Sequence, residues 1–120
     1  GVLDPLGIEG QVEASRNAQM MMVLVDWTGL CLLAAAPVNT PDGKEAFINA
    51  LNAKAGTNLT FEDLMNKSIQ ILKAEREFNL AAGLEKKDDR LPEFFYKEPL
   101  PPHNKVFLLS DEEMDKVFDF

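Results

Sequence analysis

The 120-residue sequence has only one cysteine, one histidine and no excess of basic residues. A single cysteine cannot form a disulfide within the chain, which excludes a disulfide-stabilised secreted domain and favours a reducing, cytoplasmic setting. The 12 basic and 20 acidic residues give a net charge of -8, which repels phosphate groups and argues against binding to nucleic acid. His103, the lone histidine, follows two prolines, and we expect a solvated loop residue rather than a catalytic one.

No apolar run is long enough to predict a membrane-spanning helix. The most apolar stretch, Met20 to Ala36, contains Asp26 near its middle, whereas about 20 apolar residues are expected of such a helix. No cleavable signal segment is recognisable, and we expect no membrane association. With 46% apolar and 27% charged residues, the composition is that of a globular protein, and the length suits a single domain over residues 1–120.

Sustained alternation of apolar and polar residues, which would indicate strands, is also missing, and its best example is the short run Val106 to Leu109. Helical spacing of apolar residues predominates instead. The sequence predicts an all-α fold of four or five helices in a single domain. A proline-rich extended strap, Asp88 to Pro102, is expected across them. The helices are expected at about 12–25, 41–55, 61–82, 92–96 and from 111 onward.

Capping residues predict where several helices begin and end. Thr40 is a candidate N-cap with Pro41 at the first helical position, and Gly56 is expected to end the same helix. Thr60, with Asp63 three residues later, predicts a capping box for the next helix. Ser110 and Glu113 repeat this pattern near the C-terminus. The residues of the Thr40-capped helix that we expect to be buried are Phe47, Ile48, Leu51 and Ala55.

The hexad Asp26 to Cys31 is unusual because it places an acid, a glycine and the only cysteine inside the most apolar stretch. Burying an unpaired carboxylate is costly, so Asp26 needs a partner there. One interpretation is structural: Asp26 lies at a helix terminus, Gly29 is a left-handed C-cap, and Cys31 is a small core residue. The other is that Asp26 and Cys31 contact a cofactor. The hexad alone leaves both open.

The pattern Asp-x-x-Gly-Leu-Cys, formed by Asp26, Gly29, Leu30 and Cys31, resembles a signature in the C-terminal part of the tungsten-dependent aldehyde ferredoxin oxidoreductases. Two further segments are similar to that family in the same order. They are LNAKAGTNLTFEDL and AEREFNLAAGLEKKDDRLPEFFYKEPLP, so the resemblance covers roughly Val23 to Pro102. It implies that the chain is the C-terminal helical domain of an enzyme that oxidises aldehydes to carboxylates and passes electrons to ferredoxin.

The resemblance also implies a role for each residue of the signature. Asp26 would hydrogen-bond a pterin of a bis-pterin tungsten or molybdenum cofactor, with Gly29 and Leu30 also on the cofactor-binding side. Cys31 would ligate a 4Fe–4S cluster. These residue types suit the groups, because a carboxylate accepts N–H bonds and iron–sulfur clusters take thiolate ligands.

One cysteine is too few for a cluster that takes four thiolates as a rule. The other ligands are therefore expected from the N-terminal and middle parts of the same enzyme. The chain alone is expected to hold no cofactor, to be inactive and to expose an apolar face that promotes self-association. An alternative is a non-catalytic helical module, derived from the same family, that binds another protein.

Arg76 is a second polar residue in an apolar setting. On a helical wheel it falls within the apolar stripe of the long helix and therefore requires a carboxylate or several carbonyl groups. A structural clamp to Asp88 or Asp89 is the favoured interpretation, and contact with a cofactor or neighbouring domain is the other. The stripe comprises Phe61, Met65, Ile69, Leu72 and Leu80.

Overall fold

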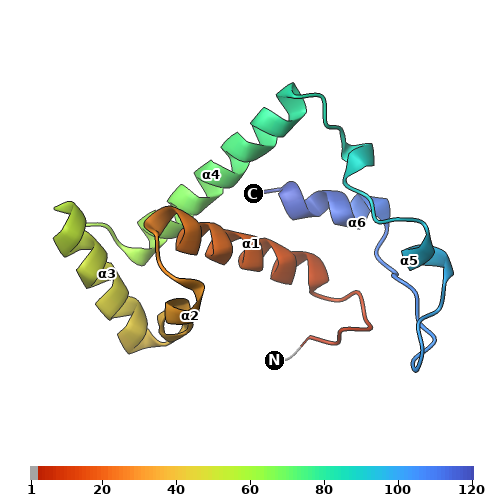
Figure 1. The fold of residues 1–120 in the computed structure, drawn as a ribbon, viewed down its shortest axis with the longest axis horizontal. Coiled ribbons are helices and arrows are strands. Elements are labelled where there is room, and N and C mark those ends of the chain that lie inside the picture. Colours follow the sequence, from red (N-terminus) through yellow and green to blue (C-terminus); the bar gives the residue numbers. More distant parts are fainter. Residues whose placement is uncertain (1–2) are drawn as a thin grey trace. The chain divides into compact units, whose positions relative to one another are not determined.

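The structure is a computed structural model that describes residues 3–120; Gly1 and Val2 lie outside the described residues. Over the described residues the chain is all-α, with six α-helices and no strand, which confirms the predicted fold class (Figure 1). The helices are α1 (Gln11–Thr28), α2 (Leu32–Ala35), α3 (Pro41–Ala55), α4 (Phe61–Ala81), α5 (Phe94–Lys97) and α6 (Asp111–Asp115). Three 3-10 turns accompany them: η1 (Ala36–Asn39), η2 (Lys86–Asp88) and η3 (Lys116–Phe118). The sixth helix exceeds the expected four or five because Leu32–Ala35 forms a helical turn of its own.

The chain separates into two compact units. The central unit comprises Ala18–Arg76, and the terminal unit combines Gly1–Asn17 with Glu77–Phe120. The single-domain organisation over residues 1–120 therefore stays a prediction.

The central unit contains the fully buried residues of the described chain. Ser68 of α4 is completely buried, and its hydroxyl accepts a hydrogen bond from the Trp27 indole N–H at 3.1 Å and donates to the Leu64 carbonyl at 3.2 Å. Both polar groups are therefore satisfied, which removes the cost of burying them. The buried apolar residues around this contact are Leu24, Val25, Ala35, Val38 and Leu64.

The predicted caps of α3 are confirmed. The Thr40 hydroxyl accepts a hydrogen bond from the Gly43 N–H at 3.2 Å, Pro41 opens the helix, and Gly56 closes it with a φ of 67°. The expected burial is only partly right, since Phe47, Ile48 and Leu51 are half-buried and Ala55 is exposed. The reason is that the main neighbour of α3 is the short η1, a single 3-10 turn of four residues.

The capping box of α4 is also confirmed. The Thr60 N–H donates to the Asp63 carboxylate at 2.8 Å, and the Asp63 N–H donates to the Thr60 hydroxyl at 3.2 Å. The hydrogen bond from the Thr60 hydroxyl, followed by that from its backbone, lowers the pKa of Asp63 below its usual value. Ser110 caps α6 in the predicted way, since its hydroxyl accepts the Glu113 N–H at 3.2 Å. Local pairs such as these need no tertiary partner.

The terminal unit has no fully buried residue among those described. After α5 the chain is non-helical from Glu98 to Ser110 and contains an isolated antiparallel bridge between Leu100 and Lys105. The Phe107 N–H donates to the Phe95 carbonyl at 2.8 Å, which holds this segment against α5. The proline-rich strap therefore contains the expected short helix and a bridged turn.

Arg90 connects the loop after α4 to α6. Its guanidinium pairs with Asp111 at 3.1 Å and with Asp115 at 3.0 Å, and Lys86 pairs with Asp115 at 3.4 Å. Burial is the largest influence on the pKa of Asp115 and raises it, but the hydrogen bonds and charges of Arg90 and Lys86 together lower it below its usual value. The predicted clamp by Arg76 stays a prediction, and the ion pairs of Arg90 were missed.

No single helix of the described residues is long and apolar enough to cross a membrane. Only α1 taken together with Leu32–Asn39 meets the requirements of length and composition, and the two are bent by 117° relative to each other.

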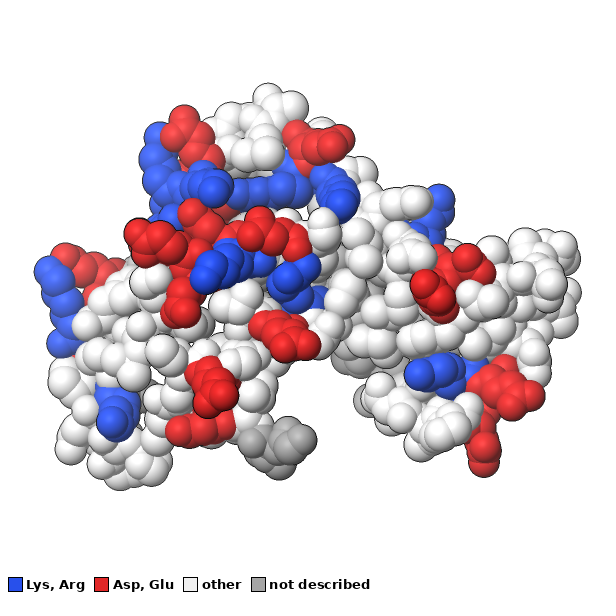
Figure 2. Space-filling model, turned by 180° about the vertical axis from the view of Figure 1, so that it is seen from behind, with Lys and Arg blue, Asp and Glu red and all other residues white. Residues whose placement is uncertain are grey.

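On the face shown in Figure 2, basic side chains are interspersed with acidic ones.

Candidate functional site

The signature residues lie at the turn that ends α1. Gly29 has a φ of 73°, and its N–H donates to the Asp26 carbonyl at 3.1 Å. The Leu30 N–H donates to the Val25 carbonyl at 3.1 Å, which completes a Schellman motif. The predicted left-handed cap at Gly29 is therefore confirmed, and its two hydrogen bonds fix the path of the chain between Asp26 and Cys31.

Gly29 is required by the backbone conformation and not by lack of space. A Cβ atom built on Gly29 would meet nothing within 4 Å. However, L-residues adopt a positive φ only at a cost, about 1 kcal/mol or more. A glycine at this position therefore preserves the turn geometry, whatever lies next to it.

The structure places the side chains of Asp26 and Cys31 in solvent. Both residues are exposed, and neither the carboxylate nor the thiol makes a hydrogen bond or ion pair with any residue of the described chain. The interpretation of Cys31 as a small core residue is therefore wrong. Leu24 and Val25 of the same apolar stretch are buried, but Leu33 is 89% exposed. The physical reason is that the turn at Gly29 carries the chain away from the packed face of α1.

Cys31 begins the next helical turn. Its backbone is extended, with φ -67° and ψ 133°, and its carbonyl accepts the Ala34 N–H at 2.8 Å. Its side chain makes no capping hydrogen bond, so the thiol is available to an external partner. Trp27, by contrast, uses its indole N–H within the central unit, bonded to Ser68.

An exposed carboxylate and an exposed thiol thus flank one rigid turn, next to the apolar side chains of Leu32 and Leu33. A thiolate binds iron and a carboxylate accepts N–H bonds, so these residues fit the contacts implied by a cluster and a pterin. They do not complete a site, because no group of three or more His, Cys, Asp or Glu side chains that could hold a metal occurs within residues 3–120. The chain can supply one thiolate and one carboxylate to a site completed by other residues.

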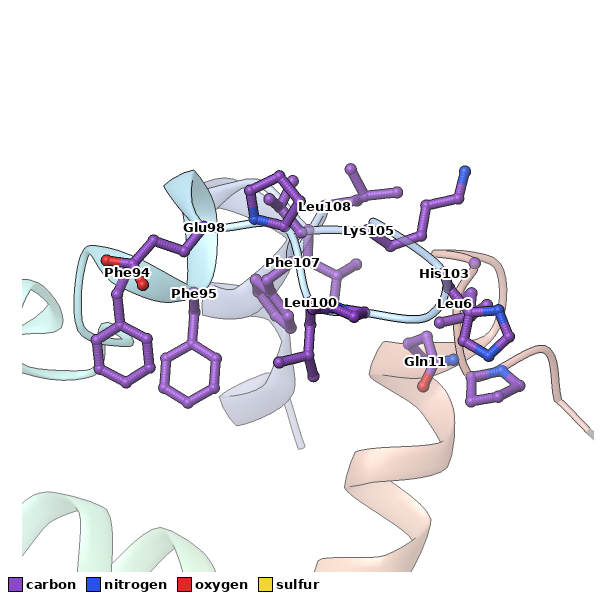
Figure 3. A pocket seen from close by; sticks show the side chains of 16 residues that line it. Leu6, Gln11, Phe94, Phe95, Glu98, Leu100, His103, Lys105, Phe107 and Leu108 are labelled. Carbon is purple, nitrogen blue, oxygen red and sulfur yellow. The ribbon is translucent and has the colours of Figure 1, made fainter.

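The terminal unit contains a cavity of about 580 Å³ that was not predicted from the sequence (Figure 3). Three segments form it: the residues before α1, the region of α5, and the non-helical segment that follows. The sequence pointed to the strap but could not show that it encloses space. The lining residues are Pro5, Leu6, Gly7, Gln11, Phe94, Phe95, Glu98, Pro99, Leu100, Pro101, His103, Lys105, Val106, Phe107, Leu108 and Leu109.

The sequence of this chain matches one family of known proteins. The family model described as "Aldehyde ferredoxin oxidoreductase, domains 2 & 3" matches residues 2–119. The tungsten-containing aldehyde ferredoxin oxidoreductase of Pyrococcus furiosus is 39% identical over 84 residues, which are 69% of this chain and 13% of that protein. The enzymes of the same name from Thermococcus kodakarensis and Pyrococcus abyssi are 38% and 37% identical over 98 residues, or 80% of this chain and 16% of each relative.

The chain thus spans less than a fifth of the length of these relatives. No solved structure was found to match it.

Proposed function

Since the chain belongs to the aldehyde ferredoxin oxidoreductase family, we propose that it forms the C-terminal part of an enzyme that oxidises aldehydes to carboxylates with ferredoxin as the electron acceptor. The observation that carries the proposal is the turn at Gly29, where Asp26 and Cys31 are exposed, unpaired and held by the Schellman motif. This turn lies within the region that matches the family. A reducing cytoplasmic setting suits an exposed thiol with this role.

Each residue of the turn has a definite task in this proposal. The Asp26 carboxylate accepts N–H hydrogen bonds from a pterin, and the Cys31 thiolate ligates one iron of a 4Fe–4S cluster. Gly29 and Leu30 set the path between these two residues through their backbone hydrogen bonds. When bound, the tungsten or molybdenum group supplies the oxidation chemistry, and the cluster carries electrons onward.

The apolar neighbours of Cys31 support the same assignment. Leu32 and Leu33 are both exposed directly after the cysteine. In an assembled enzyme they would exclude water from the side of a cluster, and solvent exposure is one of the factors that set the potential of such a group. The remaining thiolates must come from the part of the enzyme that this chain does not span, so the chain alone is inactive.

The experiment uses the chain assembled with the complementary part of the family enzyme. Cys31→Ala should lower the iron bound per enzyme molecule without changing the stability of the chain, because the thiol is exposed and makes no capping hydrogen bond or disulfide in the described structure. Asp26→Asn should lower the pterin content, and Asp42→Asn is the matched control, because Asp42 is also exposed but lies on α3. Unchanged iron in the Cys31→Ala enzyme would remove the cluster role.

A non-catalytic module that binds a protein partner is the second candidate function. It is favoured by the terminal unit, which exposes many large apolar side chains and has no fully buried residue among those described. The same preparation distinguishes the two candidate functions. A stable complex with the complementary part that contains neither iron nor pterin supports the module and contradicts the enzyme.

A further inference from the structure

The proposed function does not use the cavity of the terminal unit, which is called the groove below. A unit with no fully buried residue has little internal apolar packing, yet several of its large apolar side chains line one concave surface. Phe94 and Phe95 stack with their ring centres 4.3 Å apart, but Phe95 remains 43% exposed. Contiguous exposed apolar surface of this kind marks a site of association.

The two ends of this groove differ in charge. Figure 3 shows Glu98 beside Phe94 at one end, whereas Lys105 and His103 lie toward the end formed by Leu6 and Gln11. Neither Glu98 nor Lys105 has an ion pair with any described residue. Leu100 and Leu108, which also line the groove, expose apolar surface. The groove is therefore apolar along its length and has one acidic and one basic end.

We propose that this groove receives an apolar polypeptide segment from the part of the family enzyme that this chain does not span. This inference rests on the proposed function. The length of the relatives supports that occupant, because matches of 13% and 16% leave more than four-fifths of each relative outside this chain. The segment carries aromatic or aliphatic side chains, with an acidic group toward Lys105 and a basic group toward Glu98.

Other occupants fit less well. A second copy of this chain carries the same net charge of -8, so the two would repel each other as they approach. A small ligand normally has most of its surface enclosed, whereas Leu108 in this groove is 53% exposed. A polypeptide that continues beyond both ends of the groove has no such requirement.

Photo-crosslinking tests the occupant directly in the assembled enzyme. p-Benzoylphenylalanine in place of Phe95 should crosslink to the complementary part and should map to one apolar segment by mass spectrometry. The same group in place of Phe78 is the control, since Phe78 is 73% exposed in the same unit but does not line the groove. Crosslinks from Phe95 to a second copy of this chain, or equal crosslinking from both positions, would overturn the inference.

A pair of leucines provides a second measurement. Leu108→Gln should weaken binding of the complementary part by about tenfold, because an apolar contact of the groove lining is lost. Leu84→Gln, at a leucine that is 46% exposed and outside the groove, should change binding by no more than about twofold. Equal losses for both leucines would indicate general apolar adhesion and would contradict a specific groove.

Iron content, measured in the same preparations, separates this inference from the proposed function. Groove crosslinks in a complex without iron support the docking surface and contradict the role of Cys31. An iron-containing complex without crosslinks from Phe95 supports the role of Cys31 and contradicts the docking surface.

Discussion

Replacing Gly29 by alanine should lower the melting temperature of the chain and, in the assembled enzyme, should also lower its iron content. Gly29 has a φ of 73°, and an added Cβ would meet nothing within 4 Å, so the stability cost is backbone strain alone. That strain is about 1 kcal/mol, which corresponds to a fall of about 4 °C for a chain of this size. The loss of iron follows because relief of the strain moves Cys31 relative to Asp26.

Gly56 provides a matched control. It ends α3 with a φ of 67°, and a Cβ there also meets nothing within 4 Å. Gly56→Ala should therefore cost about the same stability, roughly 1 kcal/mol. It should leave the iron content unchanged, because no signature residue follows it. Asparagine tolerates a positive φ better than alanine, so Gly29→Asn should recover part of both losses.

Thermal denaturation of the chain, followed by circular dichroism, and iron analysis of the assembled enzyme together test this reasoning. Equal iron contents in the Gly29→Ala and Gly56→Ala enzymes would show that the turn has no role beyond ending α1. An unchanged melting temperature in Gly29→Ala would refute the left-handed conformation itself.

Two further predictions concern stability. Gly43→Ala should destabilise the chain in urea denaturation, because the new Cβ would lie 2.0 Å from the Pro37 carbonyl oxygen. Helix propensity alone predicts the opposite, a gain of about 1 kcal/mol. A rise in stability would therefore contradict this packing. The lowered pKa of Asp115 makes its ion pairs with Arg90 and Lys86 stabilising above the ordinary carboxyl pKa of 3.8, and this contribution is lost as the pH falls through the lower pKa of the folded state. Asp115→Asn should therefore reduce the loss of stability between neutral and strongly acidic pH, measured as melting temperature against pH, and an unchanged acid dependence would contradict it.

The features that the sequence predicted best are those formed between residues close in the chain. Thr40 with Gly43, and Thr60 with Asp63, are three residues apart, and their hydrogen bonds form as soon as the helix begins. Gly29 takes the left-handed conformation for an equally local reason, since only the backbone at the end of α1 requires it. Such signals need no knowledge of what packs nearby.

Features that depend on distant partners were predicted poorly. Cys31 was a candidate core residue, but it is exposed, as is Leu33 after it, because no other described part of the chain covers them. The ion pairs of Arg90 with Asp111 and Asp115, which lie more than 20 residues further along the chain, were not predicted. Residue type indicates that an arginine needs a carboxylate but does not indicate which one.

By itself, the sequence determined the helical class, the caps and the resemblance to the family that matches residues 2–119. Only the tertiary structure decided that the Asp26 carboxylate and the Cys31 thiol face solvent, that Ser68 is buried against Trp27, and that the strap encloses an apolar groove. The difference is physical: caps and turns arise from neighbours in the chain, whereas exposure is set by which distant surfaces come together.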